Sequence, residues 1–225
     1  MTLVFFFTLL VAAGAMVGRS VANPWSKDNG SEHARIDCPV VFDGRILRNT
    51  TLKSFDTDGA TPYQARYVHG VNLTWSEILR FPEVENSMFD QTMDKSLEVT
   101  ISDASLFKPS SGNLQTGFRR AGLLLSANNG SDASNVGVKT FHWSVKQDPA
   151  RAMNLSHEYM NVWHETNDYS HNQFSFKAGV VLFVTNQTAK TDWKITDYKD
   201  RILWSTPILF TEWQNFAVTL DYSKK

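Results

Sequence analysis

The feature of this sequence that most limits its fold is a series of short β-type segments separated by turn residues. Leu97–Ile101 and Lys139–Val145 alternate between apolar and polar side chains, as strands with one buried face do. Gly179–Val184 is a continuous apolar run, which predicts a strand buried on both faces. Two further β-type segments are Val40–Phe42 and Trp213–Leu220, and turn residues gather at 109–112, 128–131, 148–149 and 167–168. Because only Trp75–Leu79 indicates a helical turn, we predict an all-β fold, either a β-jelly roll or a two-sheet sandwich.

The N-terminal residues indicate a secreted, extracellular protein. Residues 1–17 are almost wholly apolar, but the run is shorter than the roughly twenty residues of a membrane span. Ser20-Val21-Ala22 fits a small-x-small cleavage site, so we predict a signal peptide over 1–22, with an uncleaved anchor as the alternative. Residues 23–37 are polar and lack periodicity, which predicts a flexible leader before a single domain over 38–225.

The charge of the chain gives no reason to expect nucleic acid or a membrane surface as a partner. Its 22 Lys and Arg residues nearly balance its 23 Asp and Glu residues, for a net charge of -1. No basic run is present either, and basic patches are what those two partners attract.

Six N-x-S/T acceptors and a single cysteine agree with an extracellular route. The acceptors are Asn29, Asn49, Asn72, Asn129, Asn154 and Asn186. If these asparagines carry glycans, they must face solvent. Cys38 cannot form an intramolecular disulfide, so the core must hold the domain together. We predict a buried thiol for Cys38, with a free or intermolecularly bonded one as the alternative.

The stretch H-E-Y-M-N-V-W-H-E, residues 157–165, holds two His-Glu pairs. On a regular strand Glu158, Met160, Val162 and His164 share one face, and His157, Tyr159, Asn161, Trp163 and Glu165 share the other. Glu158 and His164 are then roughly 20 Å apart, too far to bind one metal ion. The spacing also differs from the H-E-x-x-H pattern of zinc proteases. We therefore predict no metal site and no cofactor.

Acidic and aromatic side chains favour a carbohydrate substrate. Glycoside hydrolysis needs two carboxyl groups about 5–9.5 Å apart, so Glu158 and Glu165 cannot both serve from one regular strand. Glu98 is the best-placed partner on another strand, with Asp90 and Asp103 as weaker candidates. Tryptophans able to stack on sugars, or to fill the core, are Trp75, Trp143, Trp163, Trp193, Trp204 and Trp213.

A set of motifs along the chain resembles a known family. The motifs are C-P-V-V-F-D-G-R from Cys38, L-T-W-S-E-I from Leu73, G-F-R-R from Gly117, G-V-K-T-F-H from Gly137 and L-S-H-E-Y from Leu155, followed by Glu165, Asp168-Tyr169-Ser170 and W-Q-N-F from Trp213. In this order, from about Cys38 to Tyr222, they resemble glycoside hydrolase family 131, the secreted fungal β-glucanases. The resemblance implies a β-jelly roll that cleaves β-1,3-, β-1,6- and β-1,4-glucosidic links with acids from adjacent strands.

The resemblance also gives expected roles to individual residues. Glu158 is expected to be the carboxylate at the scissile bond, acting as acid or base, with Glu165 as the competing assignment. Glu98 is the candidate second carboxylate. The side chains expected to line the groove are Arg119, Arg120, His142, Tyr159 and Trp163. We expect a monomer with β-glucan as its partner.

Two departures from the family pattern leave other functions open. The family continues its double arginine as Arg-Arg-Ala-Glu-Leu, but here Gly122 stands in place of that glutamate. Family members also continue past the position of Lys225, through strands that carry a histidine of the active cleft. A glycine cannot protonate a leaving oxygen or activate water, so a β-glucan-binding relative with impaired catalysis is the second hypothesis. A polysaccharide lyase that uses His142 and Tyr159 is the third.

Overall fold

The computed structural model describes residues 3–14, 39–66, 69–126 and 136–224. By their contacts, the residues divide into two compact units. Unit 1 comprises 1–5 and 146–212, and unit 2 comprises 6–145 and 213–225. The predicted all-β fold is confirmed, because several antiparallel sheets account for nearly all regular structure, as in a β-sandwich or jelly roll. The helical turns among the described residues are all too short for a membrane span.

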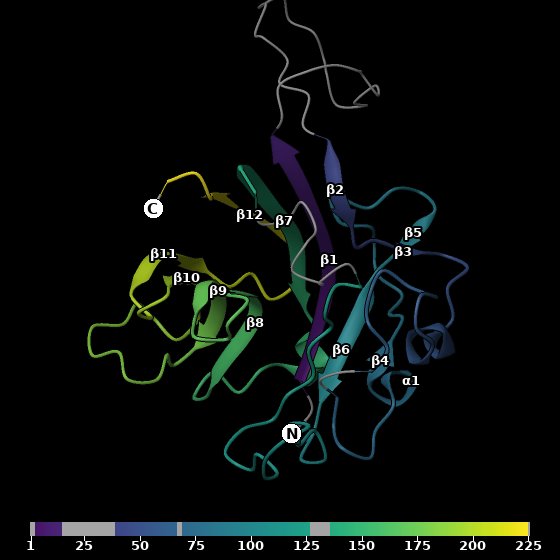
Figure 1. Ribbon diagram of the computed structural model, residues 1–225, viewed down its shortest axis with the longest axis horizontal. Coiled ribbons are helices and arrows are strands. Elements are labelled where there is room, and N and C mark those ends of the chain that lie inside the picture. The colour runs from purple at the N-terminus through teal and green to yellow at the C-terminus, as the bar shows by residue number, and fades with distance from the viewer. Residues whose placement is uncertain (1–2, 15–38, 67–68, 127–135, 225) are drawn as a thin grey trace, which may run out of the picture. The chain divides into compact units, whose positions relative to one another are not determined.

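Unit 2 is built on a six-stranded sheet (Figure 1). Its order is β12-β7-β1-β6-β4, and β2 also pairs with β1. The strands are β1 (Leu3–Gly14), β2 (Val40–Asp43), β4 (Leu79–Arg80), β6 (Leu97–Ile101), β7 (Val138–Gln147) and β12 (Gln214–Asp221). A second, two-stranded sheet joins β3 (Ile46–Leu47) to β5 (Asp94–Lys95). The strands predicted over 40–42, 97–101, 139–145 and 213–220 are confirmed, because they coincide within a few residues with β2, β6, β7 and β12.

Strand β1 occupies an interior position of this sheet, between β7 and β6 (Figure 1). Its residues fall within the predicted signal peptide, so in the full-length chain this segment forms a strand. An apolar sequence suits an interior strand as well as it suits a signal peptide. Cleavage after Ala22 stays a prediction; the leader over 23–37 and Cys38 lie outside the described residues.

The apolar face of β6 packs on a core beside two helical turns. The turns are η1 (Leu52–Asp56) and α1 (Trp75–Ile78). Leu97 of β6 lies in one buried cluster with Trp75, Phe55 and Leu79. A capping box starts α1, because the Thr74 backbone N–H donates to Glu77 Oε2 at 2.7 Å. The helical turn predicted at Trp75 is therefore confirmed.

Unit 1 is built on a four-stranded antiparallel sheet in the order β11-β10-β9-β8. Its strands are β8 (Glu158–Glu165), β9 (Asn172–Gly179), β10 (Asp192–Asp197) and β11 (Ile202–Pro207), and a 3-10 turn, η3 (Pro149–Arg151), precedes them. Phe176 and Trp193 stack with their ring centroids 4.8 Å apart, and both are buried. The side chain of Lys194 is also buried, and its Nζ donates to the carbonyls of Gly179, Ala189 and Asp192.

The strand predicted over Gly179–Val184 is wrong. Strand β9 ends at Gly179, whose φ of +77° turns the chain out of the sheet. Leu182 and Phe183 are exposed in the loop that follows, although the apolar run suggested burial on both faces. The turn is held by side chains from other positions, Glu158 and Gln187, which a local apolar pattern does not reveal.

The predicted faces of β8 are also wrong beyond Met160. A bulge between Met160 and Val162 shifts the register, so Val162 lies opposite Phe176. Residues directly opposite on antiparallel strands share a face, so Tyr159, Val162 and His164 now lie on one face. The rings of His164 and Phe174 stack on that face at 6.1 Å.

Candidate active site

Glu98, the predicted second carboxylate, is the most enclosed of the three predicted catalytic glutamates. It lies on β6 with 1% of its surface exposed, and its carboxylate Oε1 is 3.9 Å from Arg80 Nε. Arg80 lies directly opposite Glu98 on β4, so both side chains are on the face away from Leu97 and the apolar core. A buried ionisable side chain beside a specific charged group is a candidate functional group.

The segment of the double arginine lies in the same unit as Glu98. Arg119 Nη2 donates to Asp103 Oδ1 at 3.1 Å, and its Nη1 donates to the carbonyls of Thr116 and Phe118. The Arg120 guanidinium lies 5.1 Å from the ring centroid of Phe107. These contacts fix the local loop. Gly122, which follows, is buried, so the position where the family pattern has a glutamate is an interior one.

His142 is a half-buried residue of β7. Its ring meets Phe89 edge to face, with the centroids 5.5 Å apart, and Ala217 of β12 lies directly opposite. Burial lowers the pKa of His142, because the charged imidazolium loses hydration there. The neutral ring is therefore the favoured form in the folded protein.

Because burial lowers the pKa of His142, we expect the free energy of unfolding to fall as the solution becomes acidic. Since its folded pKa is depressed, the unfolded chain binds more protons, and acid favours unfolding as the pH falls through about 6.5. Above that pH the contribution is fully retained. Melting temperatures measured from pH 8 to pH 5 should fall more steeply for the wild type than for His142→Gln. Parallel curves for the two proteins would contradict this role of His142.

Glu158, the predicted carboxylate at the scissile bond, has its hydrogen-bond partners within unit 1. Its Oε1 lies 3.2 Å from Nζ of the buried Lys177, and its Oε2 accepts from the Leu182 backbone N–H at 2.7 Å. Lys177 also donates to Asp200 Oδ1 at 2.7 Å. Because both oxygens of Glu158 accept hydrogen bonds, the geometry suits an anchor of the loop after β9 and does not suit a proton donor.

No pattern along the sequence indicates this ion-paired group of Glu158, Lys177 and Asp200. Lys177 lies in a stretch of β9 with buried apolar side chains, and Asp200 lies in the turn after β10. Their pairing depends on how three strands come together, so no local spacing could have indicated it.

The remaining residues predicted on β8 have different surroundings. Tyr159 is buried, and its hydroxyl accepts from the Asn154 backbone N–H at 3.0 Å, which is a core position. Trp163 is half-buried, while Glu165 is exposed at the end of the strand, opposite Asn172. Of the tryptophans, Trp75, Trp143 and Trp193 are fully buried and therefore belong to the core.

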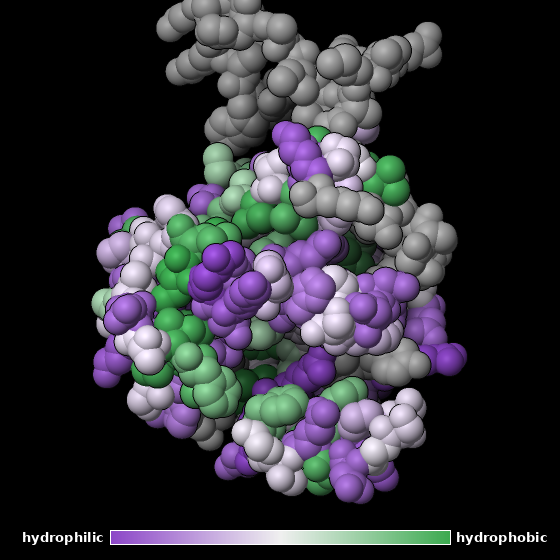
Figure 2. Space-filling model, turned by 60° about the vertical axis from the view of Figure 1, so that its left-hand side comes forward, coloured by the Kyte–Doolittle hydropathy of each residue, from purple (hydrophilic) through white to green (hydrophobic). Residues whose placement is uncertain are grey.

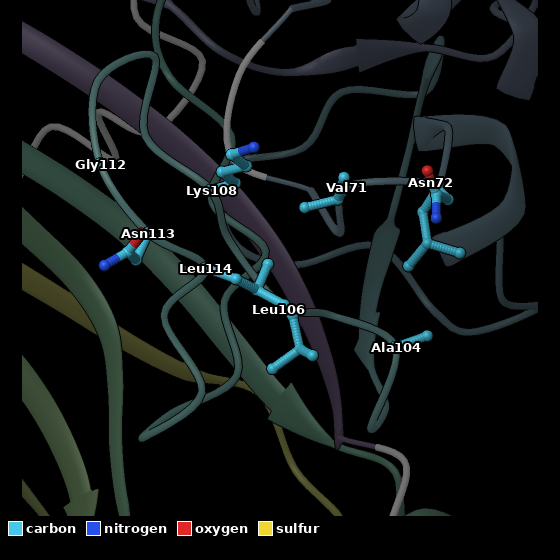
Figure 3. Close-up of a pocket in the computed structure, with 9 residues that line it drawn as sticks. Val71, Asn72, Ala104, Leu106, Lys108, Gly112, Asn113 and Leu114 are labelled. Atoms are coloured by element: carbon cyan, nitrogen blue, oxygen red, sulfur yellow. The ribbon is translucent and has the colours of Figure 1, made fainter.

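A hollow in unit 2 contains none of the residues predicted for catalysis or substrate binding (Figure 3). Its volume is about 480 Å³, and its lining includes Val71, Leu106, Lys108 and Leu114. No carboxylate lines it, so this hollow does not supply the carboxyl groups that glycoside hydrolysis needs. Within the described ranges, no three His, Cys, Asp or Glu side chains gather as metal ligands.

One comparison with known proteins gives a match that covers most of this chain. Among the curated proteins, no match to the chain is found. The family model described as the glycoside hydrolase 131 catalytic N-terminal domain matches residues 40–225. That match takes in all three glutamates, the double arginine, Gly122 and His142. The chain therefore belongs to glycoside hydrolase family 131.

Proposed function

We propose that this protein is a secreted β-glucan hydrolase of β-1,3-, β-1,6- or β-1,4-glucosidic links, with Glu98 as a carboxylate at the scissile bond. The family match over residues 40–225 carries the proposal. Hydrolysis of a glycosidic link needs a carboxyl group that protonates the leaving oxygen or activates water. Glu158 is held by its contacts to the loop after β9, and Glu165 is exposed at the end of β8, which leaves Glu98, with Arg80 opposite it, as the better candidate for that role.

Surface features support the secreted route. Four of the six N-x-S/T acceptors lie among the described residues, and the asparagines of all four are exposed, as glycosylation requires. They are Asn49, Asn72, Asn154 and Asn186; Asn29 and Asn129 lie outside the described residues.

One observation favours a second function, a β-glucan-binding relative with impaired catalysis. Gly122 occupies the place of a family glutamate, and glycine offers no group for proton transfer. Such a protein would keep its polysaccharide ligand but cleave it slowly or not at all.

One pair of measurements on the full-length protein distinguishes the two functions. Reducing-sugar release from laminarin and from cellulose-type glucans reports cleavage, and a pull-down on the same polymers reports binding. We expect release of reducing sugar. Binding without release would favour the second function, and the absence of both would contradict each of them.

A further inference from the structure

The loop between β9 and β10 exposes an aromatic ring in a strained backbone conformation. The side chain of Phe183 is fully exposed, at 102%, and its φ is +64°. A non-glycine residue in this left-handed region is disfavoured, especially a bulky one. Exposure of a phenyl ring also forgoes the gain from burial. Strain that the surrounding structure maintains without benefit to the core points to a function of the residue.

Hydrogen bonds hold this loop in one conformation. Gln187 Oε1 accepts from the Val181 N–H at 2.8 Å, while its Nε2 donates to the carbonyls of Val181 and Val184. Glu158 accepts from the Leu182 N–H. Two side chains, Glu158 before Phe183 in the chain and Gln187 after it, therefore hold the loop that exposes the ring.

The same loop carries the acceptor Asn186, in F-V-T-N-Q-T from Phe183 to Thr188. Asn186 is exposed and follows Phe183 by three residues, and Gln187, which folds the loop back, is the middle residue of the acceptor triplet. None of the other three described acceptors has an exposed aromatic three residues earlier. The residues at that position are the buried Ile46, the half-buried His69 and Arg151.

We propose that Asn186 carries an N-linked glycan whose first N-acetylglucosamine stacks on Phe183 and stabilises this loop. The Asn186 amide nitrogen bonds to C1 of the sugar, the diphosphate of the host's lipid-linked donor leaves, and the amide loses a proton. The polarised C–H groups of one sugar face meet the negative face of the aromatic ring. Figure 2 shows apolar residues exposed among polar ones on one face of the molecule. Phe183 is a fully exposed apolar residue, and this glycan would cover it.

The test uses the full chain produced through the secretory route of a eukaryotic host. Glycopeptide mass spectrometry first measures the occupancy of Asn186. Melting temperatures then compare the wild type, Asn186→Gln, Phe183→Ala and the double variant. Asn154→Gln is the matched control, because it removes an exposed acceptor that has no such ring.

We expect Asn186→Gln to lower the melting temperature by about 2–4 °C, the shift typical of one stacking contact in a chain of this length. The same substitution in the Phe183→Ala background should change it little, and Asn154→Gln should have little effect. Trimming the glycans to one N-acetylglucosamine should keep the stabilisation, because only the first sugar reaches the ring. Thr188→Ala removes the threonine that the N-x-S/T triplet requires but keeps Asn186, so it should lower the melting temperature as Asn186→Gln does.

Two results would overturn the proposal. One is an unglycosylated Asn186 in the secreted protein. The other is an equal loss of melting temperature from Asn186→Gln with and without Phe183, since the glycan would then act without the ring.

Discussion

The Glu98→Gln variant is expected to hydrolyse β-glucan about 10²- to 10⁴-fold more slowly than the wild type, while still binding the polymer. Glutamine keeps the shape of the side chain and can stay near Arg80, so the loss should come from the missing acid/base group. Reducing-sugar release at saturating glucan measures kcat, and a pull-down on the same polymer measures binding.

The matched control is Glu83→Gln, an exposed glutamate of the same unit. It should change neither kcat nor binding. Thermal unfolding of both variants separates catalysis from folding, because Glu98 is buried and its replacement can also cost stability. A Glu98→Gln protein with a lower melting temperature but wild-type kcat would show that the glutamate is only a structural partner of Arg80.

The second large effect is expected for Gly179→Ala, which should destabilise the protein by about 3 kcal/mol or more. A Cβ at this position would lie 1.9 Å from the His157 carbonyl oxygen, and the backbone φ is +77°. The clashing atom belongs to the backbone, and the Val180 N–H donates to the same oxygen at 3.1 Å, so the neighbour cannot easily move. Denaturant unfolding measures the loss.

Gly59→Ala provides the control for backbone conformation alone. Gly59 has a similar φ of +79°, but an added Cβ there would meet nothing within 4 Å. Its replacement should cost about 1–2 kcal/mol, the price of a left-handed L-residue. Equal losses at the two glycines would contradict a specific clash at Gly179.

Patterns along the sequence predicted those strands in which apolar and polar side chains alternate. Alternation identified β6 and β7, and it could also have identified β9, where Phe174, Phe176 and Ala178 alternate with polar residues. The apolar run Gly179–Val184, which follows β9, instead predicted a strand several residues too far along the chain. The run looks like a strand because nothing local shows that Glu158 and Gln187 fold it into a loop.

The site was less accessible to sequence reasoning than the fold. Glu98 could be named because it lies in a clearly alternating strand, but its pairing with Arg80 depends on register. The faces of β8 could not be derived, because the bulge after Met160 has no local sequence mark. Carboxylate pairs are defined by distances across strands, and spacing along one strand cannot supply them.

The interior place of β1 has a consequence for how the chain matures. A signal peptidase that cuts after Ala22 would take away the strand that joins β7 to β6, leaving each of them with an unpaired row of backbone amides and carbonyls. Residues 3–14 can be exported and discarded, or they can bridge the two parts of the sheet, but one molecule cannot do both. If cleavage after Ala22 occurs, the precursor and the processed protein therefore differ in how the strands of this sheet pair.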